Sequence, residues 1–140
     1  MVEVNYIAVL LAALATMLVG SVWYTPAVFG KIWMKLAKVK PDQKMTTVQM
    51  TKLFGLTFIA ALVSAYVLAH VTYLSNQFFG NTFLQDALST GFWLWLGFVV
   101  ARILTHDLFE GRPGKLTLLT VGNEFVTIMV MALIIGLFGV

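Results

Sequence analysis

Four long apolar runs, separated by short polar segments, make up most of this chain. They cover approximately residues 5–24, 50–74, 83–105 and 116–138. Each run supplies the roughly 20 residues that an α-helix needs to cross a bilayer core about 30 Å thick. Thr46 with Gln49, and Thr82 with Gln85, have the spacing of a capping box before the second and third runs. The pattern predicts an all-α protein in which residues 1–140 form one domain, a transmembrane four-helix bundle.

A fifth segment, residues 27–39, lies between the first two runs and has a different pattern. Its apolar and basic side chains recur every three or four residues but fall on different helix faces. The apolar face holds Phe29, Ile32, Trp33 and Leu36, and the basic face holds Lys31, Lys35 and Lys38. This pattern is typical of an amphipathic helix in the membrane interface, with its lysines toward anionic head groups. The alternative is an ordinary solvated face, and a tryptophan beside the end of a span favours the interface.

Composition agrees with a membrane location. The chain is 60% hydrophobic and 11% charged, and its mean hydropathy is +0.92. All nine basic residues lie on the two connections 31–52 and 102–115, whereas the termini and the connection near residue 78 have none. The positive-inside rule therefore predicts that both basic connections are cytoplasmic and both termini are outside. We expect a multi-pass protein of the bacterial inner membrane.

Two short stretches resemble a known family. Residues 23–33 read Trp-Tyr-Thr-Pro-Ala-Val-Phe-Gly-Lys-Ile-Trp, and residues 109–113 read Phe-Glu-Gly-Arg-Pro. On these stretches the chain resembles a bacterial domain-of-unknown-function family of small four-span integral membrane proteins, marked by Trp-Tyr-x-Pro-x-x-Phe-Gly-x-x-Trp. The resemblance implies the four-span architecture and no activity.

Small side chains recur every fourth residue on the first two spans. They are Ala8, Ala12, Thr16 and Gly20 on the first, and Ala61, Ala65 and Ala69 on the second. Such stripes let helix backbones approach closely in lipid. We interpret them as packing faces within the chain, and a dimer seam is the alternative.

Glu124 is the most informative polar residue, because it lies inside the fourth span beside Asn123. It is roughly 12 Å past Leu116, and Arg102 on the third span is roughly 10 Å deep from the same side. A lone charge at such depth is costly. We predict that Arg102 and Glu124 form a buried ion pair. The alternatives are a proton- or ion-linked carboxylate at Glu124 and an arginine that extends to the interface.

The sequence offers little for catalysis. It has no cysteine, no nucleophile beside a base, no metal-ligand set and no phosphate-binding glycine loop. We therefore expect no enzyme, no cofactor and no nucleic-acid partner. The expected role is a structural or accessory subunit that packs with itself or with other membrane proteins, in contact with lipid. The alternative is an oligomeric small-solute or ion transporter that uses Glu124.

Overall fold

The structure is a computed structural model that describes residues 2–39 and 45–140, and these residues contain helices and no strand. The helices are α1 (Tyr6–Trp23), α2 (Gly30–Ala37), α3 (Thr47–Phe79), α4 (Phe83–Leu94), the π-helical turn η1 (Trp95–Val100), α5 (Ala101–Glu110) and α6 (Gly114–Phe138). Because α4, η1 and α5 are continuous, four helices are long and apolar enough to span a membrane. The predicted all-α architecture with four spans is confirmed, and the chain is a multi-pass membrane protein.

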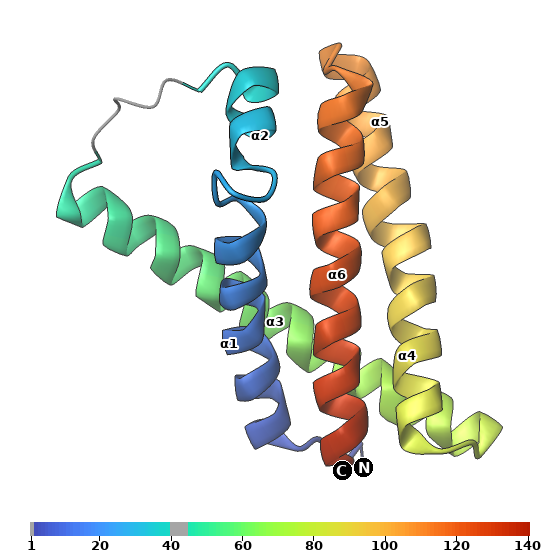
Figure 1. Ribbon diagram of the computed structural model, residues 1–140. Helices are drawn as coiled ribbons and strands as arrows, with labels where there is room; N and C mark the ends of the chain where they lie inside the picture. Colours follow the sequence, from blue (N-terminus) through green and yellow to red (C-terminus); the bar gives the residue numbers. More distant parts are fainter. Residues whose placement is uncertain (1, 40–44) are drawn as a thin grey trace.

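Helix α6 lies at the centre of the arrangement. Figure 1 shows it between α1 and the continuous α4–α5 helix, with α3 crossing behind them at a steep angle. Both termini lie at one end of the molecule, beside the turn between α3 and α4. The opposite end carries α2 and the turn between α5 and α6, and we call it the basic end because Lys31, Lys35, Arg112 and Lys115 lie there.

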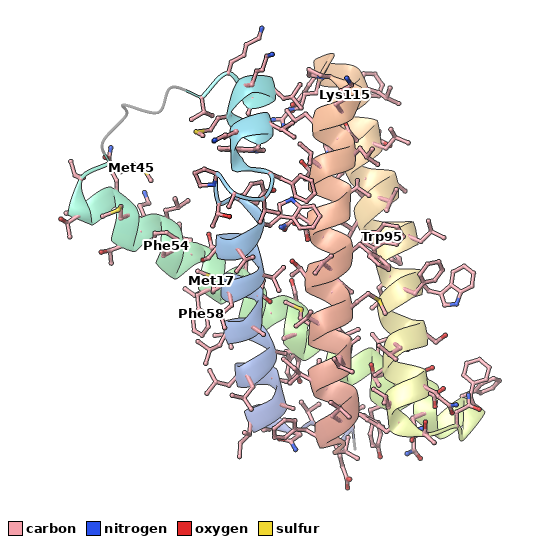
Figure 2. The ribbon with its side chains drawn as sticks, viewed as in Figure 1. Met17, Met45, Phe54, Phe58, Trp95 and Lys115 are labelled. Carbon is pink, nitrogen blue, oxygen red and sulfur yellow. The ribbon has the colours of Figure 1, made fainter. Side chains whose placement is uncertain are left out.

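Helix α3 packs on the others along only part of its length. It has 33 residues, so it is about 50 Å long and exceeds the thickness of a bilayer core. Residues 47–60 are exposed except for the half-buried Phe58, and burial begins at Ala61. Figures 1 and 2 show this first half, with Met45 and Phe54, extending away from α6. We call residues 47–60 the open segment of α3.

The small-residue stripes lie where α1 and α3 cross. Five of their alanines are buried in the core of this chain: Ala8, Ala12, Ala61, Ala65 and Ala69. Thr16 and Gly20 continue the stripe on α1 toward the basic end but are only half-buried. A Cβ added at Gly20 would meet no atom within 4 Å. The stripe on α1 therefore runs past the point where α3 leaves it.

Both capping boxes predicted from the sequence are present, and they explain where two helices begin. The Thr46 hydroxyl accepts from the Gln49 backbone N–H, the Gln49 side chain accepts from the Thr46 N–H, and Thr82 and Gln85 repeat this geometry. The Lys38 residue that ends α2 has a left-handed φ of 55°.

The segment predicted as an interfacial helix over residues 27–39 is shorter than expected. Residues 24–29 form a turn, and α2 covers only Gly30–Ala37. Figure 1 shows α2 stacked beyond the end of α1, beside the start of α6. Its place in the membrane interface stays a prediction. Trp33 and Leu36 line a cavity together with Pro113 of the next hairpin. Of the residues predicted to anchor this helix, four are exposed, namely Lys31, Ile32, Lys35 and Lys38, and Phe29 is half-buried.

Candidate functional site

The turn between α1 and α2 is fixed by its backbone hydrogen bonds. The Thr25 carbonyl accepts from the Val28 and Gly30 N–H groups at 3.1 and 2.8 Å, and the Trp23 carbonyl accepts from Phe29 at 3.1 Å. A Cβ at Gly30 would overlap the backbone of Thr25. Glycine is therefore required for this close approach, which brings α2 back over the end of α1.

Aromatic side chains attach this turn to the rest of the protein. The rings of Trp23 and Phe29 are 4.5 Å apart, and those of Tyr24 and Trp33 are 5.3 Å apart. The Trp23 indole also lies against Gly122 of α6, where an added Cβ would be 3.5 Å from its ring. The turn is thus docked on α6 one residue before Asn123.

Glu124 lies on the side of α6 that faces the core. Thr117, Met131 and Ile135 share its helical stripe, at separations of 7 and 11 residues, and all three are buried. Glu124 itself is only half-buried. Burial raises the pKa of the Tyr24 phenol, and the negative charge of Glu124 raises it further, which indicates that the two groups are close. Glu124 therefore lies on the core-facing side of α6, near Tyr24 at the end of α1.

Buried polar groups without partners gather near this carboxylate. The Asn123 amide nitrogen and the Trp23 indole nitrogen are buried and make no hydrogen bond. Within residues 2–39 and 45–140, Glu124 makes neither a hydrogen bond nor an ion pair, and both ion pairs found there belong to Arg112. Leaving buried polar groups unpaired is unfavourable. We call Glu124, Asn123, Trp23 and Tyr24 the polar site.

The predicted Arg102–Glu124 pair is absent from the structure. Arg102 is exposed, whereas its neighbour Ile103 is half-buried. The cause is the π-helical turn η1. In an uninterrupted α-helix Arg102 would share the face of Trp95, seven residues earlier, which contacts α6. A π-helical turn takes up about one extra residue and rotates the rest of the helix by roughly 100°.

Trp95 shows which face of this helix meets α6. Its indole N–H donates to the Val121 carbonyl at 3.1 Å, and its ring lies 4.8 Å from that of Phe125. Figure 2 shows Trp95 beside α6 at mid-height. The rotation at η1 therefore turns Arg102 away from the neighbour that the sequence had predicted for it.

An apolar cavity lies further along α6, toward the termini. It has a volume of about 440 Å³ and is lined by residues of α3, α4, η1 and α6, including Ser64, Phe98, Ile128 and Met131. Ile128 and Met131 come after Glu124 by one and two helical turns. The cavity therefore begins about one turn of α6 beyond Glu124, on the side toward the termini, and no residue of the polar site lines it. Among the described residues, no three His, Asp or Glu side chains cluster as metal ligands.

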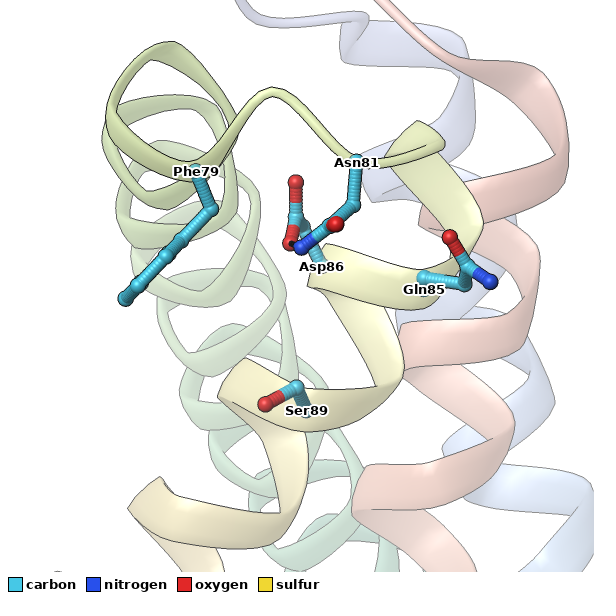
Figure 3. A pocket seen from close by; sticks show the side chains of 5 residues that line it. All are labelled: Phe79, Asn81, Gln85, Asp86 and Ser89. Atoms are coloured by element: carbon cyan, nitrogen blue, oxygen red, sulfur yellow. Dashed lines mark hydrogen bonds between the residues drawn. The ribbon is translucent and has the colours of Figure 1, made fainter.

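Two further carboxylates, which the sequence pattern did not mark as site residues, stabilise the hairpins. Asp86 is only 2% exposed and accepts from the Asn76 and Asn81 amides at 2.8 and 2.9 Å. Figure 3 shows Asp86 and Asn81 side by side in a pocket of about 420 Å³ at the turn between α3 and α4. The available signal was an aspartate in the first turn after a capping box.

Asp107 has the corresponding position at the basic end. Its Oδ2 accepts from the Thr117 hydroxyl at 2.6 Å, and its Oδ1 lies 3.8 Å from Arg112 Nε. Its backbone carbonyl accepts from the Arg112 N–H at 2.9 Å. Asp107, with the adjacent turn, therefore fastens α5 to α6, and this aspartate has partners, whereas Glu124 has none among residues 2–39 and 45–140.

Comparison with known proteins gives one match. A family model described as a protein of unknown function (DUF1761) matches residues 7–136. No curated protein matches the chain, and no solved structure matches it.

Proposed function

The chain belongs to the DUF1761 family of unknown function, and from its geometry we propose that it is a structural or accessory membrane subunit that packs against other transmembrane helices. One observation carries this proposal. The open segment of α3 extends away from the other helices and is exposed apart from the half-buried Phe58, so this part of the span has no neighbouring helix within the described residues.

Exposed apolar side chains alone do not support this proposal, because lipid covers them as well as protein does. The polar and small positions are different. An unpaired charge inside the bilayer costs at least about 2.5 kcal/mol on insertion scales. Gly55 lies inside α3 and Gly20 lies in the last turn of α1, and an added Cβ at either position would meet no atom within 4 Å. Positions of this kind are typical of close helix–helix contacts. A helix from outside the chain would use both features.

The proposal includes an orientation. We propose that the basic end faces the cytoplasm and both termini face outward, in a bacterial inner membrane, because lysine and arginine concentrate at that end. The exposed Lys31, Lys35 and Lys38 then point toward anionic head groups. The proposed role contains no catalytic step.

Site-directed photo-crosslinking tests the packing role. A photo-reactive residue replacing Phe54, which is 53% exposed on the open segment, should give a discrete protein–protein adduct in native membranes. The matched control replaces Phe78 on the same helix, which is also exposed but lies past the packed part of α3. An adduct from Phe54 and not from Phe78 supports the proposal. Adducts with lipid alone at Phe54 would contradict it.

A second candidate function is favoured by Glu124 itself, an intramembrane carboxylate without an ion-pair partner among the described residues. Carboxylates at such depth are typical of proton- or ion-linked sites, and an apolar volume of about 440 Å³ begins one turn further along α6 at Ile128. This candidate is an oligomeric transporter of a small solute or ion. Purified protein in liposomes should then show a flux that Glu124→Gln abolishes while the protein stays folded. A flux that survives Glu124→Gln would reject the role of this carboxylate.

A further inference from the structure

We infer that the helix covering the polar site comes from a second copy of this chain, and that Arg102 of one copy pairs with Glu124 of the other. The inference rests on the proposed packing role and names its partner. Its basis is charge complementarity between two intramembrane side chains that have no ion-pair partner within residues 2–39 and 45–140.

The depths of the two charges agree. Helix α6 runs antiparallel to the α4–α5 helix, and two contacts fix their register. An added Cβ at Gly91 would lie 3.0 Å from the Ala132 Cβ, and Asp107 is hydrogen-bonded to Thr117 at 2.6 Å. Between these contacts, residue numbers rise along one helix as they fall along the other.

This register places Arg102 beside Val121. Glu124 is three residues further along α6, a difference in depth of about 4.5 Å. A flexible arginine side chain can cover that difference. Two copies lying at the same depth in a bilayer can therefore bring the guanidinium of one to the carboxylate of the other, with neither helix shifted along the membrane normal.

The two charges cannot meet easily inside one copy, because they point to different sides. Arg102 is exposed on the outer side of α5, and Glu124 lies on the core-facing stripe of α6. The exposed Arg102 of one copy and the half-buried Glu124 of the other thus carry complementary charges. A bidentate guanidinium–carboxylate pair would also fix their orientation.

Extension of Arg102 to the membrane surface is a poor substitute for this pair. Arg102 lies eight residues before Glu110 at the end of α5, so its Cα is about 12 Å from that end. Helical side chains also incline toward the N-terminus of their helix, which here is away from the basic end. Both points favour a partner within the membrane.

Charge exchange between separately tagged copies tests the inference. Three kinds of pair are co-expressed, each with one tag on one copy and a second tag on the other. The pairs are each variant with itself, Arg102→Glu with Glu124→Arg, and wild type with wild type as the reference. Each variant alone places like charges in every contact, so recovery of the second tag in mild detergent should fall at least about tenfold. Co-expression of the two variants restores one charge of each sign in every contact, so recovery should return to within about twofold of wild type.

An intramolecular pair gives a different result, because mixing cannot repair it. Recovery from the mixture as low as from each variant alone would overturn the inference, and so would full association of each variant with itself. If either charge-reversed chain fails to fold, Arg102→Gln and Glu124→Gln are used instead. Each should lower recovery, and the double variant should lower it less than the product of the two effects. Independent effects would overturn the inference.

The crosslink from Phe54 separates this inference from the proposed function. Two outcomes would reject the Arg102–Glu124 contact but still support the packing role. One is an adduct with a different membrane protein, and the other is an adduct with a second copy whose association does not change with the charge substitutions. Absence of any protein adduct, together with a single copy in mild detergent, rejects both.

Discussion

The hydrogen bonds of Asp86 make a strong prediction about stability. Asp86→Ala removes the acceptor of two amide groups, those of Asn76 and Asn81, at the turn that joins α3 to α4. It also removes a negative charge from the first turn of α4, where the helix dipole favours one. The hairpin between α3 and α4 should lose its main polar link.

The expected magnitude comes from the geometry. A hydrogen bond to a charged group contributes about 1.5–3 kcal/mol, so two bonds set an upper bound of about 6 kcal/mol. The adjoining pocket of about 420 Å³ lies at the end of the helices, and water entering it can hydrate the amides left behind. We therefore expect the free energy of unfolding to fall by about 2–3 kcal/mol.

Reversible unfolding in mixed detergent micelles measures this loss. Ser89→Ala is the matched control, because Ser89 lines the same pocket and is exposed; it should change the free energy of unfolding by at most about 0.5 kcal/mol. Asn81→Ala removes one of the two hydrogen bonds, so its loss in free energy of unfolding should lie between those of Asp86→Ala and Ser89→Ala. Equal stability of the Asp86→Ala and Ser89→Ala proteins would refute the structural role of this carboxylate.

Three further predictions concern other parts of the protein. Gly136→Ala should lower the free energy of unfolding by about 1–3 kcal/mol, because the added Cβ would lie 2.8 Å from a backbone atom of α4. Gly20→Ala is the control and should not lower it, because the space around Gly20 is open. Equal losses for the two variants in micelle unfolding would contradict this packing. Thr117→Val should lower the free energy of unfolding by about 1.5–3 kcal/mol, because it removes the hydroxyl that donates to Asp107. An unchanged free energy of unfolding would show that this hydrogen bond is dispensable. A cysteine replacing Phe109, which is 90% exposed in a chain without cysteine, should react with an impermeant thiol reagent only from the cytoplasmic side; reaction from outside only would reverse the proposed topology.

Much of the fold could be predicted from the sequence because its signals are local. Length and hydrophobicity determine that four helices can cross a membrane, and the two capping boxes determine where α3 and α4 begin. The tilt of α3 is not local. It depends on how closely the alanines around Ala65 let α1 approach. Helix α3 extends past its crossing with α1 in both directions, because no residue there signals a helix end.

The candidate site was predicted only in part, and η1 shows why. Depth along a helix can be obtained by counting residues, and the register confirms that Arg102 and Glu124 lie within about one helical turn of each other. The face that a residue occupies needs an uninterrupted helical period. The segment 95–100 contains no proline and no marked polar residue, so its π-helical turn leaves no local signal. This turn rotates Arg102 away from the helix face that packs against α6.

The carboxylates Asp86, Asp107 and Glu124 differ in the partners that their own chain supplies. Asp86 and Asp107 are both more deeply buried than Glu124, lie near helix ends, and have hydrogen-bond donors from their own chain. Glu124 is further from any helix end, where the cost of an unpaired charge is greater, and it has no such donor within the described residues. Because Asp86 and Asp107 have donors at depths where an unpaired charge costs less, a partner would be expected for Glu124 as well. The open segment of α3 is exposed apart from Phe58 and supplies no donor to Glu124. On the inference above, Arg102 of a second copy supplies the partner that Glu124 lacks within the described residues.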